Sequence, residues 1–508
     1  MFINSCKEEF LETSPKAVVT KDLLSEDANG INSLLIGTYS LIDGAGATTG
    51  GIGGGAAWAA SVSNWVWGGV TSDNAYKGSS YGDQPPINPL ERHEALPSNL
   101  YCQNAWEGHY DGVSRANETL KALKQVIEKG NISEEKAKQF EGEAKFLRAW
   151  FHFELQRKFF KIPYITEDVE NPSEVPNDTK AWNQIENDLQ VAIDNLGEDP
   201  PQGEPGRADK YAAMAVKARV HLFQDEWDQA QTLLDNIINS GKFELVDHFY
   251  DNFKATTEHN KESIFEIEYA VNDFNNSPNG GWDRCLNSPY NPDIPTCCGF
   301  YQPSQDLVNA YKVNSEGLPL LGINGPEFND SNLKNDMGIT SDCEFIPSDR
   351  LVDPRLDWTV GRRGLPYLEW GIHRGMDWIR EQGNGGPYLF KKFIVPADQA
   401  GEFGSSSGWP RAALNAINYR AYRYAHVLLW RAEVAVHNNN LGRARELVNQ
   451  IRERAQGDYV MGRCTTYELP SGVDPEVDED QPAANYSLDT YDSFPSQEYA
   501  RKAVRMEW

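Results

Sequence analysis

The chain has no long hydrophobic run and no excess of basic residues. None of its 508 residues belongs to an apolar stretch of about 18 residues, the length that a membrane-spanning helix needs. Lys and Arg total 47 against 75 Asp and Glu, which gives a net charge of −28. Binders of nucleic acid or of anionic membranes need a basic footprint, so this balance argues against both classes. Hydrophobic residues make up 40% and charged residues 24%, a globular rather than a disordered composition.

Motifs of catalysis and metal binding are also scarce. The seven cysteines form no CxxC, and the nine histidines form no HExxH. The pattern G-x-S-x-G occurs at Gly78–Gly82 and Gly404–Gly408, but neither copy follows a candidate buried strand. The run Gly44–Gly55 lacks the Lys-Ser/Thr of a phosphate-binding loop, and the acidic run Asp474–Asp480 lacks the spacing of a calcium loop. We therefore expect no catalytic residues, no cofactor and no metal, although distant carboxylates of a glycoside hydrolase stay an open alternative.

Helical periodicity is the strongest positive signal. Apolar residues recur at helical spacing in eight blocks, and Ser133 is expected to cap the third of them. Strand signals are few, with alternation at Ser263–Tyr269 and a second candidate at Tyr388–Ile394. The sequence therefore predicts a mainly α fold. The helical blocks are 22–42, 104–128, 134–160, 179–196, 207–224, 227–240, 418–437 and 441–456.

Two of these regions repeat each other. The segment that starts at Lys217 (KARVHLFQDEWDQAQTLLDNIINS) aligns with the one that starts at Arg431 (RAEVAVHNNNLGRARELVNQIRER), an offset of 431 − 217 = 214. Small residues match where two antiparallel helices would cross (Ala218 with Ala432), and Leu or Ile residues match along the seam. This spacing is typical of tetratricopeptide repeats, which have about 34 residues per unit. We expect about four helix pairs, with 22–42 pairing with 104–128 and 134–160 with 179–196.

Long irregular segments rich in aromatics separate the helices. The predicted scaffold comprises 22–43, 101–245 and 416–508, after a tether at 1–21, all in one domain (22–508). The insertions are 44–100 and 246–415, and such long segments without regular structure are usually functional. The segment from Ser496 to Trp508 begins an amphipathic helix and carries no cap signal at its end. Cys297-Cys298 lies in a Pro/Gly-rich loop, which favours one or two loop disulfides of undetermined connectivity.

Five segments of the chain share a likeness to one known family. They are Ser5–Pro15, Asn64–Pro85, Glu141–Ile165, Ile417–His437 and Leu447–Ala455. In order, and over nearly the whole chain, they resemble the SusD/RagB-type nutrient-binding lipoproteins of Bacteroidota outer membranes. Cys6 lies in SCKEEFLETSP, which resembles the lipidation site and mature start of that family, although the basic and apolar regions of a signal peptide are missing. The family also continues beyond the final AVRMEW into a further helical stretch.

The resemblance implies a tetratricopeptide scaffold that presents a loop-borne binding site. It implies a surface-exposed lipoprotein of the cell outer membrane, lipidated at Cys6, that captures oligosaccharides for a SusC-like TonB-dependent transporter and is not an enzyme. One branch of the family takes up peptides, so a peptide-binding RagB-type protein is the first alternative. A tetratricopeptide adaptor that binds peptides in its helical groove, and a glycan-active hydrolase, are further alternatives.

A sugar site needs flat aromatic platforms beside polar side chains. Two loop regions supply that mixture, and each aromatic in them has the alternative role of packing the insertion onto the helices. The first region holds Trp58, Trp65, Trp67, Asp73, Asn74, Tyr76 and Tyr81; the second holds Trp282, Asp283, Arg284, Tyr290, Tyr301, Tyr367, Trp370, His373, Asp377, Trp378 and Arg380. From them we predict as ligand-binding residues Trp67, Asp73, Tyr76, Trp282, Tyr290, Tyr367, Trp370, Asp377 and Trp378.

Overall fold

The computed structural model describes residues 24–44, 56–273, 277–291, 294, 297–323, 325–407 and 413–508. The predicted tether at 1–21, with its lipidation residue Cys6, lies outside the described residues. None of the helices in the described ranges is long and apolar enough to cross a membrane.

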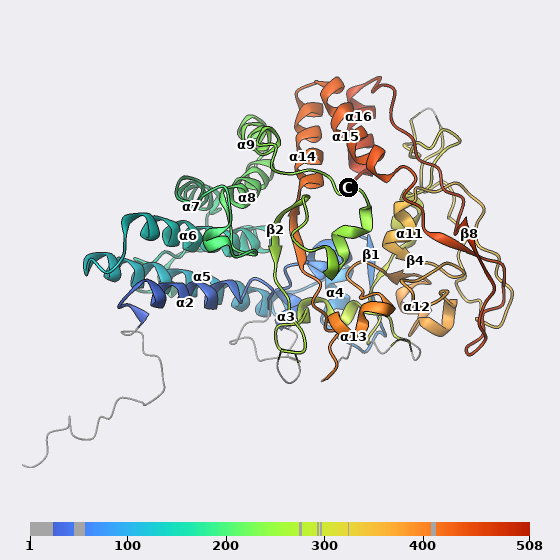
Figure 1. Ribbon diagram of the computed structural model, residues 1–508, viewed down its shortest axis with the longest axis horizontal. Helices are drawn as coiled ribbons and strands as arrows, with labels where there is room; N and C mark the ends of the chain where they lie inside the picture. The colour runs from blue at the N-terminus through green and yellow to red at the C-terminus, as the bar shows by residue number, and fades with distance from the viewer. Residues whose placement is uncertain are drawn as a thin grey trace, which may run out of the picture.

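Long helices stack one on the next to form the scaffold. Each helix packs on its successor, and α9 packs directly on α14 although the insertion 246–415 separates them in sequence. The predicted tetratricopeptide-type arrangement is confirmed, including the pairs α2/α5 and α6/α7 (Figure 1). The helices are α2 (Ala28–Tyr39), α5 (Leu100–Glu128), α6 (Glu134–Phe159), α7 (Trp182–Asn195), α8 (Lys210–Leu222), α9 (Trp227–Asn239), α14 (Tyr424–His437) and α15 (Leu441–Ala455), and α16 (Gln497–Met506) packs on α14 and α15.

Local chemistry explains where α6, the central helix of this stack, begins and ends. Ser133 caps its N-terminus as predicted, because the Ser133 hydroxyl accepts a hydrogen bond from the Lys136 backbone N–H at 3.3 Å. Glu134 and Glu135 occupy the first turn, and Arg157 and Lys158 occupy the last. Acidic residues at the start and basic residues at the end complement the helix dipole, so the sequence specifies both ends of α6.

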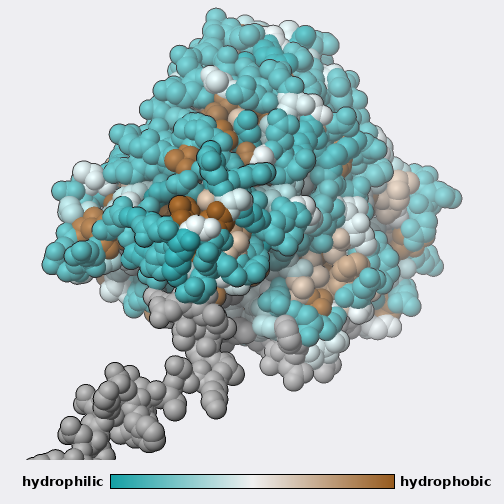
Figure 2. Space-filling model, turned by 60° about the vertical axis from the view of Figure 1, so that its left-hand side comes forward, coloured by the Kyte–Doolittle hydropathy of each residue, from teal (hydrophilic) through white to brown (hydrophobic). Residues whose placement is uncertain are grey.

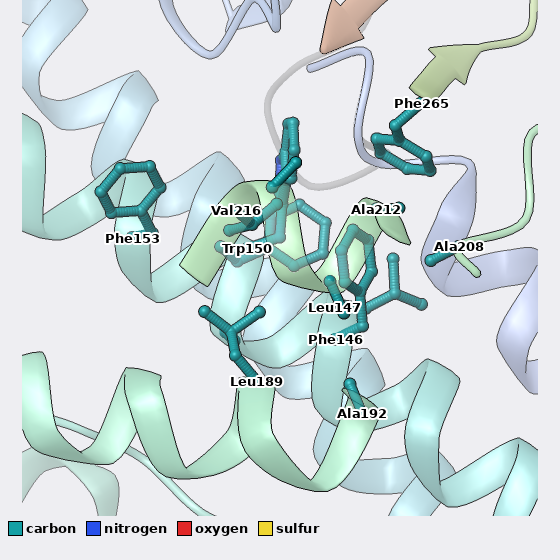
Figure 3. Close-up of a cluster of buried hydrophobic side chains, with 14 of the residues drawn as sticks. Phe146, Leu147, Trp150, Phe153, Leu189, Ala192, Ala208, Ala212, Val216 and Phe265 are labelled. Atoms are coloured by element: carbon teal, nitrogen blue, oxygen red, sulfur yellow. The ribbon is translucent and has the colours of Figure 1, made fainter. Parts of the chain in front are cut away.

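The scaffold core forms where α6, α7 and α8 meet the strand β2 (Ser263–Ile267). Trp150 of α6 lies 5.5 Å from the Phe265 ring of β2 and 5.8 Å from the Tyr422 ring of β6 (Tyr419–Arg423), so the β2–β6 pair stacks on the helices. Burying each large apolar side chain contributes about 1.5–3 kcal/mol. The buried residues labelled in Figure 3 are Phe146, Leu147, Trp150, Phe153, Leu189, Ala192, Ala208, Ala212, Val216 and Phe265.

A glycine allows α5 and α6 to approach closely. A Cβ at Gly112 would lie 2.5 Å from the Phe151 ring. We expect Gly112→Ala to lower the free energy of unfolding by about 1–2 kcal/mol, because overpacking outweighs the gain in helix propensity. The matched control is Gly37→Ala in α2, where an added Cβ meets no atom within 4 Å. Urea unfolding should move the two midpoints in opposite directions, and a Gly112→Ala midpoint at or above that of the wild type would contradict this account.

The rest of the chain forms short elements beside the scaffold (Figure 1). Strands pair two by two and antiparallel: β1 (Ala75–Gly78) with β3 (Phe300–Pro303), β2 with β6, β4 (Val360–Gly361) with β5 (Leu389–Phe390), and β7 (Met461–Cys464) with β8 (Val477–Pro482). Short helices are α3 (Ala56–Ala59), α4 (Ile87–Glu91), α10 (Gln305–Ala310), α11 (Arg355–Thr359), α12 (Gln382–Gly385) and α13 (Ala400–Phe403), with a π-helix at Trp65–Val70 and 3₁₀ turns at Pro172–Glu174, Pro201–Gly203, Phe249–Phe253, Ala255–Thr257, Trp282–Asn287, Gly375–Trp378 and Ala397–Gln399.

Both predicted strand regions contain a strand, and one predicted helix begins later than expected. The strand predicted at Ser263–Tyr269 is confirmed as β2, and the candidate at Tyr388–Ile394 contains β5. The helix predicted at 418–437 is wrong at its start, because Tyr419–Arg423 form β6 and α14 begins at Tyr424. Burial alternates along β6, which is the pattern of a strand with one covered face.

The side of the molecule seen in Figure 2 is mostly hydrophilic, with only small hydrophobic patches, as expected of a strongly charged chain.

Candidate functional site

The two insertions meet at the β1–β3 pair. Tyr76 of the first insertion is opposite Gln302 of the second, and Ala75 is opposite Pro303. The short helix α12 packs on both strands, and Asn384 in it donates a side-chain hydrogen bond to the Gly78 carbonyl at 2.7 Å. Residues more than 200 positions apart therefore share one surface.

Three tyrosines in or near this strand pair are exposed. The exposed fractions are 38% for Tyr76, 62% for Tyr81 and 47% for Tyr290. Tyr76 lies against Gly386, where an added Cβ would be 3.1 Å from the tyrosine ring. Tyr290 lies beside Gly299, and the Gly299 carbonyl accepts a hydrogen bond from the Ser79 backbone N–H at 2.5 Å. Gly386 and Gly299 therefore leave room for the Tyr76 and Tyr290 side chains, which a larger residue at either position would crowd.

Arg380 links the polar groups of the two insertions. Its Nη1 donates to Ser79 Oγ at 2.7 Å and to Asp83 Oδ2 at 2.6 Å. Its guanidinium also lies over the Tyr290 ring, 4.9 Å from the centroid, in cation–π geometry. Arg380 therefore holds Tyr290 in place from one insertion and the Ser79–Asp83 turn from the other. We call Tyr76, Tyr81, Asp83, Tyr290 and Arg380 the tyrosine platform.

A buried lysine fixes the turn that carries Tyr81. The Lys77 ammonium donates to the backbone carbonyls of Ser80, Tyr81 and Asp83 at 2.8–3.2 Å. Burial lowers the pKa of Lys77, and the nearby Glu91 and Asp83 oppose that shift. The side chain thus acts as an internal clamp rather than as a surface charge.

The electrostatics around Tyr76 keep its hydroxyl protonated. Burial raises the pKa of Tyr76, and the negative charges of Asp306, Glu91 and Asp73 raise it further. A protonated phenol can both donate and accept hydrogen bonds. The platform therefore offers apolar ring faces bordered by hydroxyls, a carboxylate and a guanidinium.

Several predicted site residues lie at or near the surface. Tyr76 and Tyr290 belong to the platform, and Asp73 is exposed in the turn before β1 with a left-handed φ of 63°. Asp377 is also exposed, and its backbone N–H donates to Ser341 Oγ. Trp67 and Trp370 are half-buried, and their indole N–H groups donate to the carbonyls of Ala59 and Val395, respectively.

Three other predicted site residues are buried, which corrects the expectation that they face a ligand. The exposed fractions are 2% for Trp282, 0% for Tyr367 and 1% for Trp378. The Trp282 indole donates to the Ser277 carbonyl at 3.1 Å, and the Tyr367 and Trp378 rings meet edge to face at 5.8 Å. The physical reason is that these rings fill hydrophobic clusters: Trp282 belongs to one shared by the two insertions and α5, and Tyr367 and Trp378 belong to one within the second insertion.

The sequence reasoning selected neither Arg380 nor Asp83 nor Tyr81 as a ligand-binding residue. Tyr81 and Arg380 belong to the aromatic-rich regions, so their composition carried part of the signal. The sequence around Asp83 carried no such signal, because the place of Asp83 in the platform depends on its hydrogen bond with Arg380, 297 positions away. The pairing of β1 with β3 and the packing of α12 on both strands bring the two segments together.

In the described part of the chain, neither central serine of the G-x-S-x-G patterns is hydrogen-bonded to a histidine. The central serine of the first copy is Ser80, whose backbone carbonyl accepts a hydrogen bond from the Lys77 ammonium at 2.9 Å. Ser406 in the second copy donates to Asn272 Oδ1 at 2.8 Å. Cys297 and Cys298 form a disulfide, as the loop composition suggested, while the cysteines described as free are Cys102, Cys285, Cys343 and Cys464.

Helix pairs that carry a loop-borne platform of exposed aromatics define a helical-repeat binding protein. Two family models match the chain: the SusD family over residues 261–508, and "Starch-binding associating with outer membrane" over residues 52–222. The chain is a SusD/RagB-like protein, and the predicted resemblance is confirmed. A SusD-like protein of Formosa agariphila is 23% identical over 89% of this chain and 79% of its own length. Another, from Bacteroides ovatus, is 26% identical over 43% of this chain and 42% of its own length.

Solved structures share the fold. A SusD-like protein from Bacteroides fragilis superposes with a TM-score of 0.66 at 18% identity, over 97% of this chain and 85% of that one. A laminarin-binding SusD-like protein gives 0.63 at 20% identity, over 95% and 88%. Surface glycan-binding protein A from Bacteroides thetaiotaomicron, in complex with laminarihexaose, gives 0.58 at 19% identity, over 84% and 82%. These similarities establish the fold of the chain.

Proposed function

We propose that this protein is a non-catalytic, cell-surface glycan-binding lipoprotein that captures an oligosaccharide and delivers it to a SusC-like TonB-dependent transporter. The observation that carries the proposal is the tyrosine platform, where Arg380 braces an exposed ring from one insertion and a polar turn from the other. Proteins of the same fold that bind laminarin or laminarihexaose support a carbohydrate ligand.

The chemistry of the platform suits a sugar. Pyranose rings present apolar C–H faces that stack on aromatic rings, and tyrosine gives that contact at low entropic cost with a hydroxyl at its edge. Asp83 and Arg380 provide the acceptor and the donor that hydroxyl-rich ligands require. Trp67, Asp73, Trp370 and Asp377 also stay proposed ligand-binding residues, and among them Asp73 is close enough to Tyr76 for its charge to raise the pKa of that tyrosine.

The position in the cell is part of the proposal. Lipidation at Cys6 would attach the protein to the outer membrane, in agreement with the family description that names an association with that membrane. The net charge of −28 suits a solvated surface protein and disfavours nucleic acid as a partner.

A polysaccharide panel tests the binding function. The protein beginning at Lys7 is run through native gels that contain laminarin, starch, xylan, mannan or pectin, and retardation by at least one of them is expected. Incubation with the retarding polysaccharide should release no reducing ends. Retardation by none of them, together with binding on a peptide array, would replace this proposal with the peptide-binding RagB-type function. Release of reducing ends would identify a hydrolase.

A further inference from the structure

A second candidate binding site lies on the scaffold, outside the tyrosine platform. A cleft of about 640 Å³ opens between α5 and the segment 163–177 that follows α6. This volume is within the range of small-ligand sites, about 300–1,000 Å³. Two aromatic rings of α5 and apolar side chains of both segments line it, among them Trp106, Tyr110, Val113, Pro163, Val169 and Val175.

A row of aromatic rings leads into this cleft. Trp67 lies 6.5 Å from the Phe159 ring, Phe159 lies 5.1 Å from Trp106, and Trp106 lies 4.8 Å from Tyr110, centroid to centroid. All four rings are half-buried. Trp65 and Trp378, by comparison, are only 1% exposed. The rings therefore form a partly open strip of aromatic surface.

The walls of the cleft are held by satisfied polar groups. The Tyr110 hydroxyl donates to the Pro163 carbonyl at 2.7 Å, and the Asn117 side-chain amide donates to the Ile165 carbonyl at 3.0 Å. These bonds tie the segment 163–177 to α5. The cleft is thus a built feature of the fold, with both walls fixed.

Other polar groups around the cleft have no hydrogen-bond partner among the described residues. Among the described residues, the Trp106 indole N–H has no acceptor, whereas that of Trp67 donates to the Ala59 carbonyl at 2.7 Å. The Ser114, Thr166 and Asn177 side chains also line the cleft without a hydrogen bond to another described residue. Lys121 lies 3.7 Å from Glu118, so that charged pair is balanced. The lining therefore offers uncommitted donors and acceptors beside apolar ring faces.

We propose that this cleft is a second carbohydrate-binding site, which takes an uncharged oligosaccharide segment stacked on Trp106. Aromatic rings with uncommitted hydroxyl, amide and indole groups suit a ligand that is both apolar on its faces and dense in hydroxyls. The charged side chains of the lining are the Glu118–Lys121 pair and the exposed Glu170, so the cleft has no concentration of charge that would select a charged peptide. With the tyrosine platform, the protein would hold one polysaccharide at two separate places, which increases the effective affinity by multivalency.

Fluorine NMR on protein labelled with fluorotryptophan tests this site directly. The Trp106 resonance is assigned from the spectrum of Trp106→Phe. Laminarihexaose, maltohexaose, cellohexaose, xylohexaose and mannohexaose are then titrated to millimolar concentrations. We expect at least one of them to shift the Trp106 resonance in a saturable manner. Ser114→Arg places a large side chain at an exposed position of the cleft, and it should weaken that response at least about 10-fold.

The matched variant is Tyr290→Ala, which alters only the platform and should leave the Trp106 response unchanged. A response that Tyr290→Ala abolishes and Ser114→Arg preserves would mean that the signal comes from the platform, which overturns the cleft site. Retardation in polysaccharide gels without any Trp106 response would also overturn it while leaving the proposed function intact. A Trp106 response to peptides and to no sugar would make the cleft a peptide groove. If neither gels nor NMR detect a glycan, both proposals fail.

Discussion

Replacing Arg148 with Met is expected to lower the free energy of unfolding by about 3–5 kcal/mol. Arg148 of α6 is 2% exposed, and its Nε and Nη2 donate to the two carboxylate oxygens of Asp188 in α7 at 2.6 and 2.8 Å. Its Nη1 donates to Asn117 Oδ1 of α5 at 2.9 Å and also bonds Glu167. Methionine would fill much of the volume but would remove both hydrogen bonds of the guanidinium to the buried Asp188 carboxylate, leaving Lys145, 3.5 Å away, as its remaining counter-charge. One side chain therefore joins three consecutive scaffold helices.

The effect should depend on pH. Burial raises the pKa of Glu167, but the charge of Arg148 and its hydrogen bond outweigh burial and hold that pKa at about 2, below the ordinary 4.5. A carboxyl with a lowered folded-state pKa stabilises the protein above its unfolded-state pKa, and this contribution disappears as the pH falls toward the folded-state value. The Glu167 contribution is present at neutral pH and declines below about pH 4.5. The difference in free energy of unfolding between the wild type and Arg148→Met should therefore become smaller at acidic pH.

Urea unfolding at neutral pH and at about pH 4 provides the measurement. The control is Arg92→Met, which removes an ion pair with Glu94 whose side chains are 47% and 65% exposed. Ion pairs on the surface are screened by solvent and contribute little to the free energy of unfolding, so this variant should unfold at the wild-type midpoint. Equal midpoints for Arg148→Met and Arg92→Met would contradict a structural role for the buried cluster. A difference that does not change with pH would contradict the role of Glu167.

The helix pairs could be predicted because their signal is local. Ala218 and Leu233 recur as Ala432 and Leu447, and this spacing survives an insertion of any length between the repeats. The Arg148 cluster gave no such signal. A charged residue in an amphipathic helix is usually on its solvated face, and nothing in the sequence around Arg148 indicates that Asp188 lies opposite it.

The site was harder to predict, because its geometry depends on long-range pairing. Tyr76 and Gln302 are 302 − 76 = 226 positions apart and become neighbours only when β1 pairs with β3. In irregular segments, no periodicity distinguishes a buried ring from an exposed one. Tyr290 and Trp282 looked equivalent in the sequence, yet one is 47% exposed and the other 2%. Composition therefore located the region, and the fold decided which rings face solvent.

Replacing Tyr290 with Ala is expected to weaken binding of the polysaccharide identified by the gel panel about 10- to 30-fold. The variant removes an exposed aromatic face and also the ring over which the Arg380 guanidinium lies. Because Tyr290 is 47% exposed, the fold should lose little, and the melting temperature should remain that of the wild type. Affinity electrophoresis across a range of polysaccharide concentrations gives the two dissociation constants.

Tyr467→Ala is the matched control. Tyr467 is 38% exposed, as Tyr76 is, but it lies between β7 and β8, outside both insertions, where its backbone carbonyl accepts a hydrogen bond from the Phe345 backbone N–H. This variant should bind as the wild type does. Tyr76→Ala should weaken binding in the same range as Tyr290→Ala. If the two rings stack on different sugar units, their losses in binding free energy should add in the double variant. Unchanged binding in Tyr290→Ala, with the fold intact, would remove the tyrosine platform as the glycan site and direct attention to the aromatic row that ends at Tyr110.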